Sequence, residues 1–150
     1  MAEPVFTVSS KRQIQAAPGA VWDTLTRLRD WPRWNEEVLS AAWVEGEPWR
    51  EGSSFELRHR SLFNAVTTTR ATLRMVALNS TAVWESSAGG LIAVHSFTLR
   101  NSLGGTLLTA RHAYHGWPAY GLRLLAARQQ AKLDGAMDAL QEFVEGEPRR

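Results

Sequence analysis

Three histidines and one tyrosine are the residues of this sequence best suited to acid–base chemistry or to polar recognition of a ligand. In three β-like segments, His59, His95 and His112 have the opposite alternation parity to the arginines, which rarely lie buried without a partner. Tyr114 shares the parity of His112, so all four side chains are expected on the inner face of a sheet. An imidazole accepts a proton near neutral pH, and a phenol donates a hydrogen bond to a carbonyl oxygen. The set would therefore suit catalysis on a carbonyl compound, or recognition of one.

An ordinary packed core rarely contains so many polar side chains. Gln129, near the centre of the apolar stripe of a predicted C-terminal helix, adds a fifth polar group to the inner side. A polar group buried without a partner costs roughly 1 to 3 kcal/mol, so several together favour a cavity that holds water or a ligand. The alternative is that these groups hydrogen-bond to one another or to loop ends. For any single histidine the sequence leaves both explanations open.

Apolar side chains of the same parity, and of the same helix stripe, would form the wall of such a cavity. The expected wall residues are Leu57, Leu73, Phe97, Leu133 and Met137. Met75 shares the parity of Leu73 and is also expected to point inward. Together with the polar set, this wall predicts a site for a small, largely apolar molecule.

The elements that position these residues are short strands followed by a helix. A first strand is predicted at residues 6–14, and six more are predicted at 38–44, 53–60, 65–76, 81–86, 91–100 and 106–117. The separators, such as Ala88-Gly89-Gly90 and Gly104-Gly105, supply the glycines that tight hairpins need. Consecutive strands joined by hairpins predict an antiparallel sheet.

Helical periodicity occurs in two places. A short amphipathic helix is predicted to begin at Pro18 and to be interrupted before Pro32, where a further helical turn can begin. From Pro118 to about Gly146, an apolar stripe predicts one long helix that covers the sheet, and Leu124 breaks the stripe.

The composition narrows the class of protein. With 150 residues, 44% of them hydrophobic and 21% charged, the chain is expected to form a single domain, residues 1–150. No apolar run reaches the roughly 20 residues of a membrane helix, and there is neither a secretory signal nor a cysteine. We therefore expect a cytoplasmic protein without integral membrane association. The arginines are scattered and no cofactor fingerprint occurs, so neither nucleic acid nor a cofactor is expected, and nothing sets the oligomeric state.

Three local signatures resemble those of the START/polyketide cyclase-like superfamily, also called SRPBCC or helix-grip proteins. They are Ile14-Gln15-Ala16-Ala17-Pro18 leading into Val21-Trp22-Asp23-Thr24-Leu25, then Asp30-Trp31-Pro32-Arg33-Trp34-Asn35, and Gly104-Gly105-Thr106. The resemblance covers about residues 5–144. It implies an α+β helix-grip fold, in which a seven-stranded curved antiparallel sheet wraps around the long C-terminal helix, with two short helices between strands 1 and 2. In this resemblance Trp31 and Trp34 would anchor the short helices to the sheet; the alternative is that their rings face the ligand.

The resemblance also implies a pocket between the sheet and the C-terminal helix that admits lipids, sterols, polyketides or other hydrophobic molecules. Binding of a small hydrophobic ligand, such as a lipid, polyketide or aromatic compound, is therefore the function we expect. The alternative is a polyketide cyclase or dehydratase-type enzyme. In that case His95 or His112 would act as general base, and Tyr114 would donate a hydrogen bond to the substrate carbonyl.

Two further function classes are weaker. A metal site built from His59, His95 and His112 would draw on different strands without any short ligand spacing, so no metal is expected. A protein-interaction surface would use Trp43 or Trp49, although the loop around Trp49 would suit a pocket lid equally well.

Overall fold

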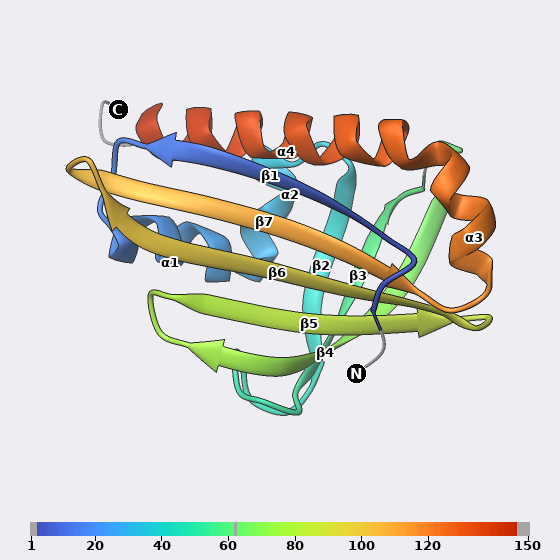
Figure 1. Cartoon of the computed structure of the whole chain (residues 1–150). Helices are drawn as coiled ribbons and strands as arrows, with labels where there is room; N and C mark the ends of the chain where they lie inside the picture. The colour runs from blue at the N-terminus through green and yellow to red at the C-terminus, as the bar shows by residue number, and fades with distance from the viewer. Residues whose placement is uncertain (1–2, 62, 147–150) are drawn as a thin grey trace.

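The computed structural model describes residues 3–61 and 63–146, which form one β-sheet and the helices that lie against it (Figure 1). The elements follow in the order β1 (Phe6–Ile14), α1 (Pro18–Thr26), η1 (Leu28–Asp30), α2 (Trp31–Trp34), β2 (Val38–Glu45), β3 (Ser54–Arg60), β4 (Val66–Ala77), β5 (Thr81–Ala88), β6 (Leu91–Ser102), β7 (Gly105–His115), α3 (Pro118–Leu122), η2 (Arg123–Leu125) and α4 (Ala126–Gly146). All predicted strands are found, with ends that differ by at most two residues from the prediction. The predicted α+β helix-grip fold is confirmed.

The two edges of the sheet are strands that follow each other in the sequence. The strand order is β1-β7-β6-β5-β4-β3-β2, and every neighbouring pair is antiparallel. The chain passes from one edge to the other through α1, η1 and α2. In Figure 1, α4 runs along β1, while β2 and β3 cross the view steeply compared with β6 and β7. The sheet is therefore strongly curved, and its concave face lies toward the helices.

Polar contacts hold α4 along β1. Arg12 Nε donates a hydrogen bond to Asp138 Oδ1 at 2.8 Å, and Ser10 Oγ donates one to Asp134 Oδ1 at 2.7 Å. Closer to the end of α4, Gln141 also donates to the backbone of β1. These contacts fix the position of the helix at one edge of the sheet.

Among the described residues, no helix combines the length and the apolar content needed to cross a bilayer.

An aromatic cluster fills the core between α2 and the sheet. The Trp31 ring packs 5.7 Å from Phe55 and 5.8 Å from Trp84, measured between ring centroids. Its Nε1 donates to Leu25 O at 2.9 Å, and Trp34 is buried beside it. Both tryptophans therefore anchor the short helical segments, as the family resemblance implied.

The loop between β2 and β3 closes one end of this cluster. Trp49 adopts a φ of 57°, and its ring lies 5.2 Å from Trp43 and 6.4 Å from Phe55. Its Nε1 donates to Thr26 O at 2.6 Å. Trp43 and Trp49 are both half-buried, so most of the aromatic surface considered for a partner packs inside the molecule.

Two irregularities change the predicted positions of side chains. The predicted long helix is interrupted by the 3-10 turn η2, where Leu124 is 84% exposed, and this turn accounts for the break in the apolar stripe. In β4, the register with β5 shifts between Leu73 and Met75. The prediction that Met75 points inward is wrong, since its side chain is 47% exposed, because the bulge changes the phase of the strand.

Candidate functional site

A row of three rings crosses the concave face where β5, β6 and β7 lie side by side. Trp84 is the register partner of His95, and His95 is the register partner of His112. Directly paired residues project from the same face of a sheet, so the three rings become neighbours. The rings of Trp84 and His95 are stacked at 5.8 Å with an interplanar angle of 2°, and the two imidazoles lie 4.1 Å apart. The structure therefore brings two of the three predicted histidines together.

Both imidazoles of this row are neutral at physiological pH. Burial lowers the pKa of His112 from 6.5 to about 4. Burial also lowers the pKa of His95 well below 6.5, and the nearby His112 and His59 add to this shift. A neutral imidazole has one nitrogen that donates and one that accepts a hydrogen bond.

The nitrogens of these two imidazoles have no partner among the described residues. Among the described residues, Trp34 Nε1 is the side-chain polar atom that is fully buried and has no hydrogen bond. The nitrogens of His95 and His112 also lack a hydrogen bond, but they are not fully buried. Both residues keep a minor fraction of accessible surface. Their hydrogen-bonding capacity is available to a molecule that reaches the concave face.

Tyr114 and Gln129 form a second polar contact, which joins β7 to α4. Tyr114 Oη donates to Gln129 Oε1 at 3.4 Å, and Phe6 stacks on the Tyr114 ring at 4.7 Å. Burial raises the pKa of Tyr114 to about 12, so the phenol keeps its proton at neutral pH. Tyr114 lies two residues from His112 on the same strand, and therefore on the same face. The structure places this pair beside the histidine row.

His59 has partners within its own hairpin. Its Nε2 lies 2.8 Å from Thr69 Oγ1, and its Nδ1 lies 3.4 Å from Arg60 O. Burial lowers its pKa, and so does Lys132, whereas the Arg60 carbonyl and Glu37 act in the opposite direction. The explanation by ordinary hydrogen bonding, left open for each histidine, therefore applies to His59.

Of the five predicted apolar wall residues, three are buried in the core and two are half-buried. Leu73, Leu133 and Met137 are closed into the core, with 1%, 6% and 2% of their surface exposed. Leu57 and Phe97 keep more accessible surface, and the Phe97 ring lies 5.4 Å from Trp84.

Trp84 is the neighbour of these groups that the sequence interpretation missed. The parity of Glu85, an ionic residue that lies on the outer face of β5, would have placed Trp84 inside. The indole links the histidine row to the aromatic core, so it belongs to the candidate site.

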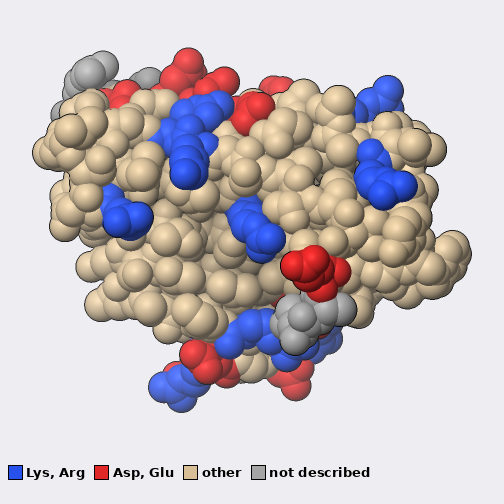
Figure 2. Space-filling view, viewed as in Figure 1, with Lys and Arg blue, Asp and Glu red and all other residues tan. Residues whose placement is uncertain are grey.

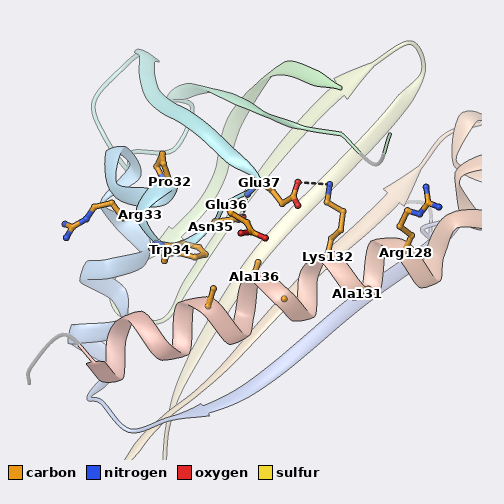
Figure 3. A pocket seen from close by; sticks show the side chains of 12 residues that line it. Pro32, Arg33, Trp34, Asn35, Glu36, Glu37, Arg128, Ala131, Lys132 and Ala136 are labelled. Carbon is orange, nitrogen blue, oxygen red and sulfur yellow. Dashed lines mark hydrogen bonds and ion pairs between the residues drawn. The ribbon is translucent and has the colours of Figure 1, made fainter. Parts of the chain in front are cut away.

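A separate groove of about 590 Å³ lies between α2 and α4 (Figure 3). Lys132 Nζ lies 3.4 Å from Glu37 Oε2 and donates to Arg60 O and Ser61 O at 3.1 and 3.2 Å. These contacts tie α4 to the end of β3, on the side away from β1. The ten predicted site residues do not line this groove.

The three-histidine metal site has no geometric basis in the described part of the chain. Within residues 3–61 and 63–146, no group of three or more His, Cys, Asp or Glu side chains is placed to hold a metal ion. His59 is instead engaged by Thr69 on the neighbouring strand.

Solved structures resemble this chain along nearly its full length. The di-domain ARO/CYC StfQ from the steffimycin biosynthetic pathway has a TM-score of 0.78 and 15% identity, covering 96% of this chain and 52% of that one. The chain thus spans about half the length of that protein. TTHA0849 from Thermus thermophilus has a TM-score of 0.76 and 19% identity, covering 93% of this chain and 97% of that one. A START superfamily protein from Mycobacterium smegmatis has a TM-score of 0.74 and 16% identity, with the same coverages.

At these identities the structural similarity shows the fold alone. A comparison with curated proteins found no match. The family described as polyketide cyclase / dehydrase and lipid transport matches residues 5–145, which is nearly all of the chain. With its START-like helix-grip fold, this chain therefore belongs to the polyketide cyclase/dehydrase and lipid transport family.

Proposed function

We propose that this protein binds a small, largely apolar molecule between the concave face of the sheet and α4, and that His95 and His112 recognise a polar group on it. The observation that carries the proposal is the state of these imidazoles. They are strongly desolvated, yet their nitrogens are unpaired among the described residues and keep accessible surface. If these imidazoles faced bulk solvent, their pKa values would stay near 6.5. If they were packed in a closed core, they would keep no accessible surface. An interior space that a ligand fills accounts for both.

The surroundings of the row favour an uncharged ligand. A neutral imidazole can donate to a carbonyl oxygen or accept from a hydroxyl group. The groups beside it are the rings of Trp84 and Phe97, and the protonated phenol of Tyr114. An anion placed there would be desolvated without a compensating positive charge from these neighbours. A keto- or hydroxyl-bearing aromatic compound, polyketide or lipid fits this chemistry best.

Binding of a neutral apolar probe tests the proposal. With N-phenyl-1-naphthylamine, we expect saturable fluorescence enhancement that a hydroxylated aromatic competitor displaces. His95→Leu should weaken the competitor by about tenfold, because its polar group would then be buried without a partner. Stability should change little, since this imidazole has no hydrogen bond in the described structure to lose. His115→Leu, on the opposite parity of β7, is the matched control and should leave both affinities unchanged.

Two results would count against the site. One is His95→Leu unfolding the protein without altering competitor affinity in the fraction that remains folded. The other is equal losses of affinity in His95→Leu and His115→Leu. Either would make His95 a structural residue. Native mass spectrometry of the purified protein, followed by extraction, would identify a ligand that is retained.

Catalysis of polyketide cyclisation or dehydration is the second candidate function. Both imidazoles are in the unprotonated form that a general base requires, and Tyr114 on the same strand keeps a proton to donate. A general base works best with a pKa near the working pH, so a pKa of about 4 makes His112 a weak one. Incubation with a linear poly-β-ketone thioester distinguishes the two functions. Formation of a cyclised product by the wild type but not by His112→Leu would establish catalysis. If the wild type leaves the substrate unchanged, ligand binding remains the proposed function.

A further inference from the structure

The segment from Trp117 to Leu125 is apolar on two faces. Ala119 is buried and Leu122 packs against the core from the inner face. On the outer face, Trp117, Tyr120 and Leu124 are 76%, 59% and 84% exposed. Their spacing of three and four residues places them on one side of the helical run. A surface helix usually carries polar residues on its outer side, whereas this second apolar face has no partner among the described residues.

The most exposed aromatic ring of this face lies against a tight turn. The Trp117 indole lies over the turn between β5 and β6, where a Cβ on Gly90 would come within 2.7 Å of Trp117 Nε1. Gly90 has a φ of 88°, a conformation that side chains other than glycine rarely adopt. The fold thus places a large, mostly exposed aromatic ring beside this turn.

Positive charge lies beside part of this apolar face. The Arg123 guanidinium lies 5.6 Å from the centre of the Tyr120 ring. Arg128 is exposed in the first turn of α4, where it also lines the groove between α2 and α4. Residues 86–133 contain no aspartate or glutamate, whereas residues 134–146 contain no lysine or arginine. Figure 2 shows acidic side chains over the C-terminal part of α4 and basic ones at the α3 end, with further basic side chains beside the acidic ones. This order opposes the helix dipole, so it does not serve to stabilise the helix.

We propose that this α3 face, formed by Trp117, Tyr120, Leu124 and Arg123, docks on membrane surfaces that contain anionic lipids, with Arg128 at the start of α4 adding to the positive charge. Tryptophan and tyrosine prefer the interface between headgroups and acyl chains, where leucine enters the apolar layer. Arginine stems can lie along the membrane while their guanidinium groups contact anionic headgroups. Docking goes beyond the proposed ligand site and does not depend on it. Gln129, which contacts Tyr114 at the proposed ligand site, follows this segment in α4. A protein docked through the α3 face would therefore hold the ligand site close to the bilayer.

Flotation of the full chain with lipid vesicles tests the proposal. We expect the protein to float with phosphatidylcholine vesicles that contain phosphatidylglycerol, and to float less with phosphatidylcholine alone or at high salt. The double variant Trp117→Ser/Leu124→Ser should reduce partitioning by about tenfold or more, because two exposed apolar side chains are lost. Arg123→Gln/Arg128→Gln should remove most of the dependence on anionic lipid and on salt. The control is Leu78→Ser/Leu103→Ser, which removes two equally exposed leucines from the turns at the opposite ends of the strands and should float like the wild type.

Three results would overturn docking. The first is recovery of the folded wild type entirely apart from the vesicles, and the second is a loss of partitioning in the control variant as large as that in the α3 variant. The third is a wild-type dimer, seen by light scattering, that ignores vesicles and becomes monomeric on Trp117→Ser/Leu124→Ser, which would assign the face to self-association. Competitor binding by His95 is measured without vesicles, so failure of docking and failure of the ligand site are distinguishable.

Discussion

The neutral state of His112 makes the stability of the protein depend on pH in a predictable way. Its pKa is about 4 in the folded chain and about 6.5 when unfolded. Because the folded value is the lower one, protonation favours the unfolded chain. The stability associated with neutral His112 is fully present above about pH 6.5 and is lost as the pH falls toward 4. At about pH 5, protonation of His112 shifts the folding equilibrium roughly 30-fold toward the unfolded state, which corresponds to a loss of about 2 kcal/mol.

Urea unfolding at about pH 7.5 and about pH 5 measures this effect. The wild type should lose about 2 kcal/mol more unfolding free energy across this interval than His112→Leu, because carboxylates that titrate in both proteins cancel in the comparison. His95 has the same sign of shift and adds to the wild-type loss. If His112→Leu loses as much stability as the wild type between the two pH values, His112 is not desolvated in the folded state. The interior space inferred from its pKa would then lose its support.

Three further substitutions probe the surroundings of the site. Trp84→Ala should lower the unfolding free energy by about 3 to 5 kcal/mol in urea titrations, because it removes a buried ring between the aromatic core and His95; a loss below about 1 kcal/mol would show that the cluster is loosely packed. Lys132→Met should cost about 1 kcal/mol and increase amide exchange at the end of β3, since Ser61 O and Glu37 lose Lys132 as a partner and Arg60 O keeps only the contact with His59; unchanged exchange in residues 59–61 would contradict this explanation. Gly90→Ala should destabilise by about 1 kcal/mol or more and shift the Trp117 side-chain signals in NMR spectra, because the position combines positive φ with close approach of the indole; an unshifted Trp117 would refute the contact.

The sequence predicted the fold closely because its signals are local. Charged residues of constant parity identify one face of each strand, and glycine-rich separators identify the hairpins. The errors occur where a single residue changes the phase or the helix type. The bulge near Met75 turned a predicted inward side chain outward, and η2 interrupted the predicted helix at Leu124. Leu124 breaks the apolar stripe and so marks the place of η2 in the sequence, whereas the bulge before Met75 has no such mark.

The candidate site was predictable only in part, because parity gives a face but not a register. It placed His59, His95 and His112 on one face, but only the alignment of β5, β6 and β7 brings His95 and His112 together beside Trp84. The partners of His59 and the bond between Tyr114 and Gln129 depend on contacts between distant segments. The tie between Lys132 and Glu37 likewise follows from the curvature of the sheet around α4.

The most direct test of the central claim is nitrogen-15 NMR of the imidazole rings of His95 and His112, recorded near neutral pH with and without a neutral hydroxylated aromatic ligand. The structure predicts two neutral rings whose nitrogen shifts both move on binding, while the shifts of His59 and His115 stay nearly constant. Saturable binding that leaves the His95 and His112 nitrogens unperturbed would contradict the claim that these imidazoles face the ligand.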